Sequence, residues 1–314
     1  MRKEILAVAA AASLVGSSAL AQQPVNRGSQ GVVNRGSQGI VNRGSQGNFL
    51  AAARAEVKRK TSNVVTVKTM DYAFQVPDTI AAGVVSFRIE NAGKELHHVW
   101  LVKLEQGKTA ADYLGAMKTW KPGQPFPSWA IDVGGPNASA PGLFAEGTLI
   151  LEPGNYLLLC HIPSPDGVPH AAKGMFKPIT VVAKGGVAQA GEAKAPEADL
   201  TITLKDYDFV TSKPIAAGRR TIRFVNDAAQ PHEAFIAKLA PGKTMQDAFA
   251  FLEKQQGPPP IMPKGGVTGI AKGRAVDFTA DFEPGDYVFI CFVPDAKDGK
   301  PHVMHGMGKV ISVK

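Results

Sequence analysis

The sequence predicts an all-β protein made of two similar Greek-key β-sandwiches in tandem, each with one short helix. Three observations favour this fold class. Gly and Pro are frequent, at 33 and 23 of 314 residues, so turns are common and long helices few. The apolar runs are short, rich in β-branched and aromatic residues, and bounded by Gly or Pro. The second half of the chain also repeats the first.

An internal duplication sets the expected domain boundaries. Asp71-Tyr72 recurs as Asp206-Tyr207 at an offset of 135 residues, and Glu152-Pro153-Gly154 recurs as Glu283-Pro284-Gly285 at an offset of 131. Similarity at a long fixed period is the mark of a repeated structural unit. We therefore predict one domain over residues 64–183 and a second over 199–314. Residues 184–198, rich in Gly, Ala and Glu, are predicted to be a linker.

Six strands and one helix are expected in each repeat. The strands of the first repeat are predicted at 64–69, 84–91, 98–104, 148–151, 156–160 and 179–182. Their counterparts in the second repeat are predicted at 200–204, 221–226, 233–239, 275–280, 287–291 and 309–313. The helices, at 110–118 and 245–254, each follow a Gly-Lys-Thr. Strands of this number and spacing are typical of a sandwich.

The N-terminal region reads as a targeting signal followed by a tail. Arg2 and Lys3 precede a short apolar run that ends in Ala19-Leu20-Ala21, the pattern of a cleaved secretory signal peptide over residues 1–21. The mature chain is expected to begin near Gln22 and to be periplasmic or secreted. No later run is long and apolar enough to predict a membrane span. Residues 22–63, which hold three copies of an octapeptide and a short helix at 51–60, are predicted to be a disordered tail.

The positive charge is confined to this N-terminal region. Residues 22–63 carry +6 and the signal peptide +1 of the formal +8, which leaves +1 for residues 64–314. A nearly neutral folded region disfavours a nucleic-acid surface.

Each repeat contains the same set of potential metal ligands in the same order. An early His is followed by Cys, His and Met, with spacings of C-x9-H-x4-M and C-x10-H-x4-M. Two imidazoles, one thiolate and one thioether form the ligand set of a type 1 (blue) copper site. The candidate ligands are His97, Cys160, His170 and Met175 in the first repeat, and His232, Cys291, His302 and Met307 in the second.

These residues resemble the cupredoxins of the plastocyanin and azurin type. In that family the first His follows an Asn-containing turn, as in the segment from Asn91 to Val99, and Cys, His and Met lie on the loop between the last two strands. The resemblance covers both repeats and implies one type 1 copper per domain that shuttles single electrons. The family often has Asn after the first His, where it ties the ligand loops together. Here His98 and Glu233 occupy that position.

Other interpretations of the candidate residues remain open. The two Cys could form a disulfide or be inert buried thiols, and the two Met could be core residues. His98 competes with His97 as a ligand, although the repeat alignment favours His97. Because adjacent strand residues point to opposite faces, His98, His161 and His305 could form a separate three-His copper site.

The predicted function is that of an exported electron carrier with one copper per domain. Its expected partners are redox proteins such as a cytochrome or a copper oxidoreductase, and not nucleic acid. Neither G-x-S-x-G nor H-E-x-x-H occurs, and we predict that the chain is not an enzyme. The alternatives are a protein for copper handling or tolerance and a copper-free β-sandwich that binds another molecule.

Overall fold

The computed structural model describes residues 63–121, 123–124, 126–183, 197–254 and 258–314. The predicted signal peptide at 1–21, the predicted tail up to residue 62 and most of the predicted linker lie outside these residues. Asn63, which the sequence analysis placed in the tail, begins the first described strand. No described helix is long and apolar enough to cross a membrane.

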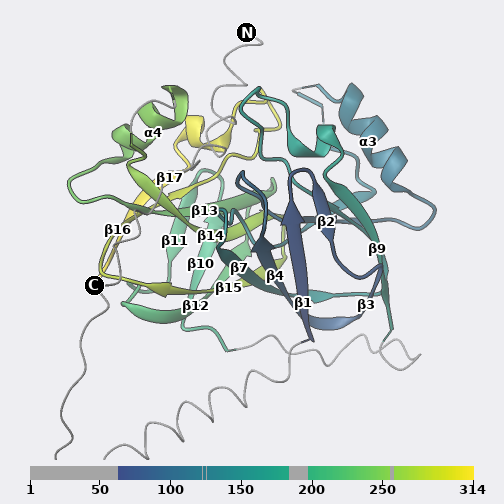
Figure 1. Cartoon of the computed structure of the whole chain (residues 1–314), viewed down its shortest axis with the longest axis horizontal. Coiled ribbons are helices and arrows are strands. Elements are labelled where there is room, and N and C mark those ends of the chain that lie inside the picture. The colour runs from purple at the N-terminus through teal and green to yellow at the C-terminus, as the bar shows by residue number, and fades with distance from the viewer. Residues whose placement is uncertain (1–62, 122, 125, 184–196, 255–257) are drawn as a thin grey trace, which may run out of the picture. The chain divides into compact units, whose positions relative to one another are not determined.

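The described residues form seventeen strands, two α-helices and two short 3-10 helices (Figure 1). The first repeat contains β1 (Asn63–Met70), β2 (Ala73–Gln75), β3 (Thr79–Ala81), β4 (Gly83–Asn91), β5 (Trp100–Leu104), α3 (Ala110–Thr119), β6 (Ala130–Gly134), β7 (Phe144–Leu151), β8 (Gly154–Leu159), η2 (His170–Lys173) and β9 (Phe176–Val182). The second contains β10 (Leu200–Lys205), β11 (Asp208–Thr211), β12 (Gly218–Asn226), β13 (His232–Leu239), α4 (Met245–Lys254), β14 (Ile261–Ile270), β15 (Ala275–Phe282), β16 (Gly285–Ile290), η4 (His302–His305) and β17 (Gly308–Val313). The prediction of an all-β sandwich fold is confirmed.

The strands belong to two sheets, and each sheet takes strands from both repeats. The strand order is β11-β10-β12-β15-β7-β4-β1-β2 in one sheet and β17-β16-β13-β14-β6-β5-β8-β9-β3 in the other. Alternate residues of β1 are buried, because successive side chains of a strand point to opposite faces. The core lies between the sheets, where Val67 and Phe87 of the first repeat and Ile202 and Phe224 of the second are fully buried.

The repeats join along both sheets. β7 pairs with β15 through Thr148 and Asp277, and β6 pairs with β14 through Val133 and Ile270. Sequence analysis missed β6 and β14 because they are short or rich in Gly and Pro. Each repeat thus contributes its own block of neighbouring strands to both sheets, and the sheets are continuous across the boundary between the repeats.

Glycine pairs allow the backbone to pack closely near this junction. A Cβ atom on Gly135 would lie 2.1 Å from the carbonyl oxygen of Val99, and one on Gly266 would lie 1.9 Å from that of Ala234. Both glycines also have positive φ angles, of 154° and 115°. The duplicated Gly-Gly is thus required where β5 meets β6 and where β13 meets β14.

Both predicted helices are present and start in the same way. Thr109 caps α3, with its hydroxyl accepting from the Asp112 amide while the Asp112 carboxylate accepts from the Thr109 amide. Thr244 and Asp247 make the same pair of bonds at the start of α4. This capping box explains why each helix begins after Gly-Lys-Thr.

Candidate metal centres

The first candidate centre gathers side chains from three separate parts of the first repeat. His97 lies between β4 and β5 and forms an isolated bridge with Ser139. Cys160 directly follows β8, and His170 is the first residue of η2. All three side chains are fully buried. The end of a strand and a short helix therefore hold the loop residues in place.

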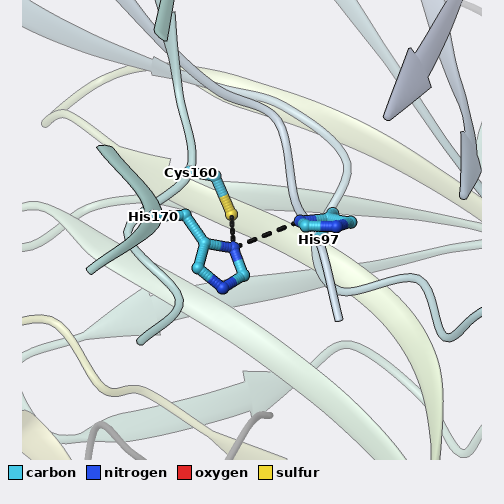
Figure 2. A group of neighbouring side chains, drawn as sticks. All are labelled: His97, Cys160 and His170. Carbon is cyan, nitrogen blue, oxygen red and sulfur yellow. Dashed lines mark hydrogen bonds between the residues drawn. The ribbon is translucent and has the colours of Figure 1, made fainter. Parts of the chain in front are cut away.

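The donor atoms of these three residues converge (Figure 2). Nδ1 of His97 lies 3.2 Å from Nδ1 of His170, which lies 3.4 Å from Sγ of Cys160. One donor atom from each residue lies within 4.8 Å of the other two. This arrangement presents two imidazole nitrogens and one sulfur to a common point.

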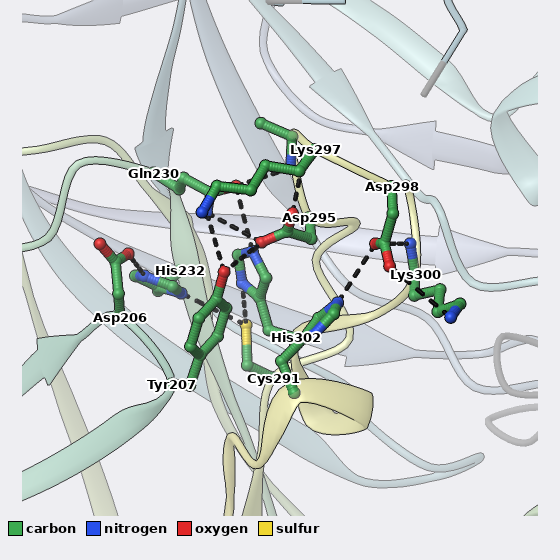
Figure 3. Close-up of polar contacts among 12 residues, drawn as sticks. Asp206, Tyr207, Gln230, His232, Cys291, Asp295, Lys297, Asp298, Lys300 and His302 are labelled. Carbon is green, nitrogen blue, oxygen red and sulfur yellow. Dashed lines mark hydrogen bonds and ion pairs between the residues drawn. The ribbon is translucent and has the colours of Figure 1, made fainter. Parts of the chain in front are cut away.

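The second candidate centre repeats this arrangement (Figure 3). His232 begins β13, Cys291 follows β16 and His302 begins η4. Sγ of Cys291 lies 3.9 Å from Nδ1 of His232 and 3.4 Å from Nδ1 of His302. These three side chains are also fully buried. In each repeat the structure thus brings together the two His and the Cys that the sequence analysis predicted as ligands.

Hydrogen-bond acceptors hold the outer nitrogens of both histidines in the first centre. Nε2 of His97 lies 2.9 Å from Oδ1 of Asp71, and Nε2 of His170 lies 2.8 Å from Oε2 of Glu95. Tyr72 in turn donates its hydroxyl to Glu95. Since a carboxylate accepts the Nε2 proton, the lone pair of each neutral imidazole is on Nδ1. The free nitrogen of each ring therefore faces the cluster.

The second centre uses a different set of acceptors for the same purpose. Nε2 of His232 lies 2.9 Å from Asp206, but Nε2 of His302 lies 3.4 Å from the amide oxygen of Gln230. Asp295 lies 3.7 Å from Nε2 of His302 and accepts hydrogen bonds from Tyr207 and Gln230. A hydrogen bond on the outer nitrogen is the usual way in which proteins orient a metal-binding histidine.

Burial makes these clusters unfavourable for a thiolate without a cation. It raises the pKa of Cys160 to about 12 and raises that of Cys291 well above its ordinary value. Burial also lowers the pKa values of His97 and His232, although their carboxylate partners oppose this. A bound copper ion would reverse the penalty on the thiolate and would coordinate the neutral imidazoles. The donor set and its orientation therefore fit copper.

The two predicted axial ligands are buried beside the cysteines. The backbone oxygen of Met175 accepts from the Cys160 amide at 3.2 Å, and that of Met307 accepts from the Cys291 amide at 3.1 Å. Both methionines are fully buried. Their position agrees with an axial role, which stays a prediction, as does coordination by the other six residues.

The residue after the first His ties the ligand loops together in both repeats. His98 accepts a hydrogen bond through Nε2 from the His161 amide at 2.8 Å. Glu233 accepts one from the Phe292 amide at 2.9 Å. In both repeats the segment of the first His is therefore bonded to the residue that follows Cys.

The structure decides between several interpretations left open by the sequence. Cys160 and Cys291 are free, so the disulfide is excluded. His97, and not His98, belongs to the first cluster. The three-His site does not form: the His98 and His161 rings lie 6.2 Å apart, whereas His305 contacts Asp298 in another cluster that also includes Asp295.

Sequence reasoning missed the residues that orient the histidines. They are Asp71, Glu95, Asp206 and Gln230. A signal for two of them was present, because Asp71-Tyr72 and Asp206-Tyr207 recur in the duplication. Their recurrence aligns the repeats, but a single sequence does not reveal which ring an acidic residue will face.

Comparison with known proteins gives structural likenesses only. No family model and no curated protein sequence matches the chain. A multicopper oxidase is similar at 15% identity and a TM-score of 0.24, over 80% of this chain and 88% of that one. Reduced auracyanin from Roseiflexus castenholzii is similar at 25% identity and a TM-score of 0.25, over 36% of this chain and 94% of that one. A blue copper oxidase from Nitrosomonas europaea is similar at 14% identity and a TM-score of 0.24, over 81% of this chain and 86% of that one.

These likenesses correct one prediction. The sequence analysis predicts that the chain is not an enzyme. The similar structures include the two oxidases above and a copper-containing nitrite reductase from Thermus scotoductus, all of which are enzymes by name. The prediction that the chain lacks enzymatic activity is therefore wrong as a conclusion from sequence.

Proposed function

We propose that the chain is a copper protein with two type 1 sites that transfers single electrons. One copper would be held by His97, Cys160, His170 and Met175. The other would be held by the corresponding residues of the second repeat, His232, Cys291, His302 and Met307. The tandem cupredoxin organisation, with domains at 64–183 and 199–314, is part of this proposal.

One observation carries the proposal. In both repeats two Nδ1 atoms and one Sγ atom converge in a buried cluster, and every outer Nε2 atom faces an acceptor. Chance burial of a Cys and two His would not be expected to orient four imidazoles in the same way. Bound copper supplies a one-electron couple at such a site, because thiolate and thioether stabilise Cu(I) and imidazole serves both oxidation states.

The residues of the chain contribute rigidity and exclusion of water. The histidines are fixed by hydrogen bonds, the cysteines are held by backbone bonds to the methionine residues, and all six are fully buried. A site held in one geometry reorganises little when its charge changes, which favours rapid electron exchange. Export through the signal peptide at 1–21 and a redox protein as partner are further parts of the proposal.

Reductive titration of the copper-loaded chain tests the proposal. We expect the blue colour to disappear after two electron equivalents per chain and to return fully when a mild oxidant is added. If the chain instead served copper handling, the alternative function from the sequence analysis, we would expect a different result. Cu(I) would then be retained and the colour would not return, and that outcome would contradict electron transfer.

A further inference from the structure

A cavity of about 340 Å³ lies between the two repeats. Its walls come from α3 and the segment after it, from β6, and from the segments that follow Cys160 and Cys291. Neither candidate copper centre contributes a ligand to its lining. The volume falls within the range of cavities that bind small organic molecules.

Aromatic side chains dominate the cavity walls. Six of them line it: Trp100, Tyr113, Trp120, Phe126, Phe235 and Phe292. Trp120 and Phe126 stack nearly parallel, with ring centroids 4.8 Å apart and an interplanar angle of 8°. The faces of such rings carry partial negative charge and attract cations, most strongly where water is excluded.

Two carboxyl groups also face this apolar space. Asp132 accepts one hydrogen bond, from Nε1 of Trp100 at 2.7 Å. Glu233 is 5% exposed and accepts from the Phe292 amide and from Asn137. Burial raises the pKa of Asp132 to about 6. Ionising this group among the apolar walls is therefore costly.

Neither carboxyl group has a cationic partner in the part of the chain that the structure describes. No described Lys or Arg lines the cavity, and no described ion pair includes Asp132 or Glu233. A carboxylate among apolar groups is normally paired in proteins, so a partner from outside the chain would complete this site.

We propose that the cavity binds a small organic amine, with its ammonium group beside Asp132 and its apolar body between the aromatic rings. Asp132 is the anchor because one of its oxygens accepts no described hydrogen bond, whereas both oxygens of Glu233 accept one. A metal ion fits the site less well. Among the described residues, the cavity side chains do not bring three ligand atoms together as the copper clusters do.

The cavity lies one residue along the chain from the candidate cysteine ligand of each copper centre. His161 follows Cys160 and Phe292 follows Cys291, and both line the cavity. Binding of the amine does not depend on the proposed electron transfer, because it needs only the cavity. The metal-free and copper-loaded chains are both used in the test, so that failure of one proposal is distinguished from failure of the other.

Calorimetry on the full-length chain with three matched probes tests the proposal. Benzylammonium, benzyl alcohol and benzoate have similar size and differ in charge. We expect benzylammonium to bind at least about tenfold more tightly than the alcohol, as for a hydrogen bond to a charged partner, and benzoate to bind most weakly. Quenching of tryptophan fluorescence gives a second measurement, since Trp100 and Trp120 line the cavity.

Variants locate the site. Asp132→Asn should remove most of the preference for the amine over the alcohol, while the exposed control Asp78→Asn should leave it unchanged. Trp120→Ala should weaken both probes and tests the site if Asp132→Asn does not fold. Equal binding of amine and alcohol, a preference that survives in folded Asp132→Asn, or no binding of benzylammonium at millimolar concentration would overturn the proposal.

Discussion

The two candidate copper centres share their inner groups and differ in what surrounds them. Both present two Nδ1 atoms and one Sγ atom. In the first, a carboxylate faces the outer nitrogen of each His, Asp71 on His97 and Glu95 on His170. In the second, the amide oxygen of Gln230 is the nearest acceptor to His302, at 3.4 Å, and the Asp295 carboxylate lies farther away, at 3.7 Å. The difference indicates that the duplicated chain keeps the orientation of the rings and varies the group that contacts their outer nitrogens.

The same contrast holds for the residues that tie the loops. A neutral His98 makes the bond in the first repeat and the carboxyl of Glu233 makes it in the second. Geometry is thus preserved by any acceptor of suitable reach, whereas the electrostatic field at the metal depends on which acceptor is used. Two sites with equal ligands are therefore expected to have unequal potentials.

Removing one thiol is expected to have the largest effect. Cys160→Ser and Cys291→Ser should each remove one copper and its share of the blue absorption, and the double variant should lose both. The reason is that the thiolate supplies the charge-transfer band and the strongest bond. Copper content and visible spectra check this. His305→Ala, outside both clusters, is the control and should retain two coppers; a blue double variant would contradict the assignment.

Replacing the cavity carboxyl of the first repeat, Asp132, should have a smaller effect than removing a thiol, and this effect is on the stability of the fold. Asp132 corresponds to Pro263 in the second repeat, so this half-buried acid is not duplicated. Its pKa in the folded chain, about 6, lies above the ordinary value of 3.8 because of burial. The folded state thus retains the proton, and the penalty grows as the pH rises from about 4 and is complete above about 6.

Asp132→Asn should therefore stabilise the metal-free chain by about 1–2 kcal/mol at pH 7.5 and leave it unchanged near pH 4. Urea unfolding at the two pH values measures this. Asp281→Asn, at an exposed acid, should show no such rise in stabilisation with pH. Equal effects of Asp132→Asn at both pH values would mean that water in the cavity solvates the carboxylate.

Exchanging the groups that accept from the outer histidine nitrogens should have the smallest effect, a change in reduction potential. It tests directly whether these groups make the two centres differ. Glu95→Gln gives the first centre the same nearest acceptor as the second, and removing the negative charge behind His170 should favour Cu(I). We expect its potential to rise by on the order of 60 mV, which for one electron is a tenfold change in relative affinity. The reciprocal Gln230→Glu should lower the potential of the second centre.

Redox titration in a Cys291→Ser background isolates the first centre, and a Cys160→Ser background isolates the second. Glu90→Gln, at an exposed acid, is the control and should not move the potential. Unchanged potentials in both exchange variants would show that the outer acceptors orient the rings without tuning the metal.

Much of the fold and of the two candidate sites could be predicted from the sequence because the same residues occur in the same order in both repeats. The duplication predicts the all-β fold, both helices and the convergence of His, Cys and His. Alignment also favours His97 over His98, since His232 has no neighbouring His. Local spacing was sufficient here because Cys and the second His lie on one loop.

The remaining features depend on contacts between distant residues. Asp71 and His97 are 26 residues apart, and Glu95 and His170 are 75 apart. The Asn137 bond to Glu233 links the two repeats. Neither periodicity nor composition reveals such pairs. The continuity of the sheets was also missed, because the strands at the junction, β6 and β14, lack a clear alternating pattern.

Copper stoichiometry measured together with the visible spectrum tests the central claim most directly. The full-length chain, produced with copper and freed of loosely bound metal, should contain two coppers and no other metal in comparable amount. It should show the strong visible band of thiolate–copper charge transfer. A colourless chain, one that retains zinc in place of copper, or one with a single copper would contradict the claim that both repeats form type 1 sites.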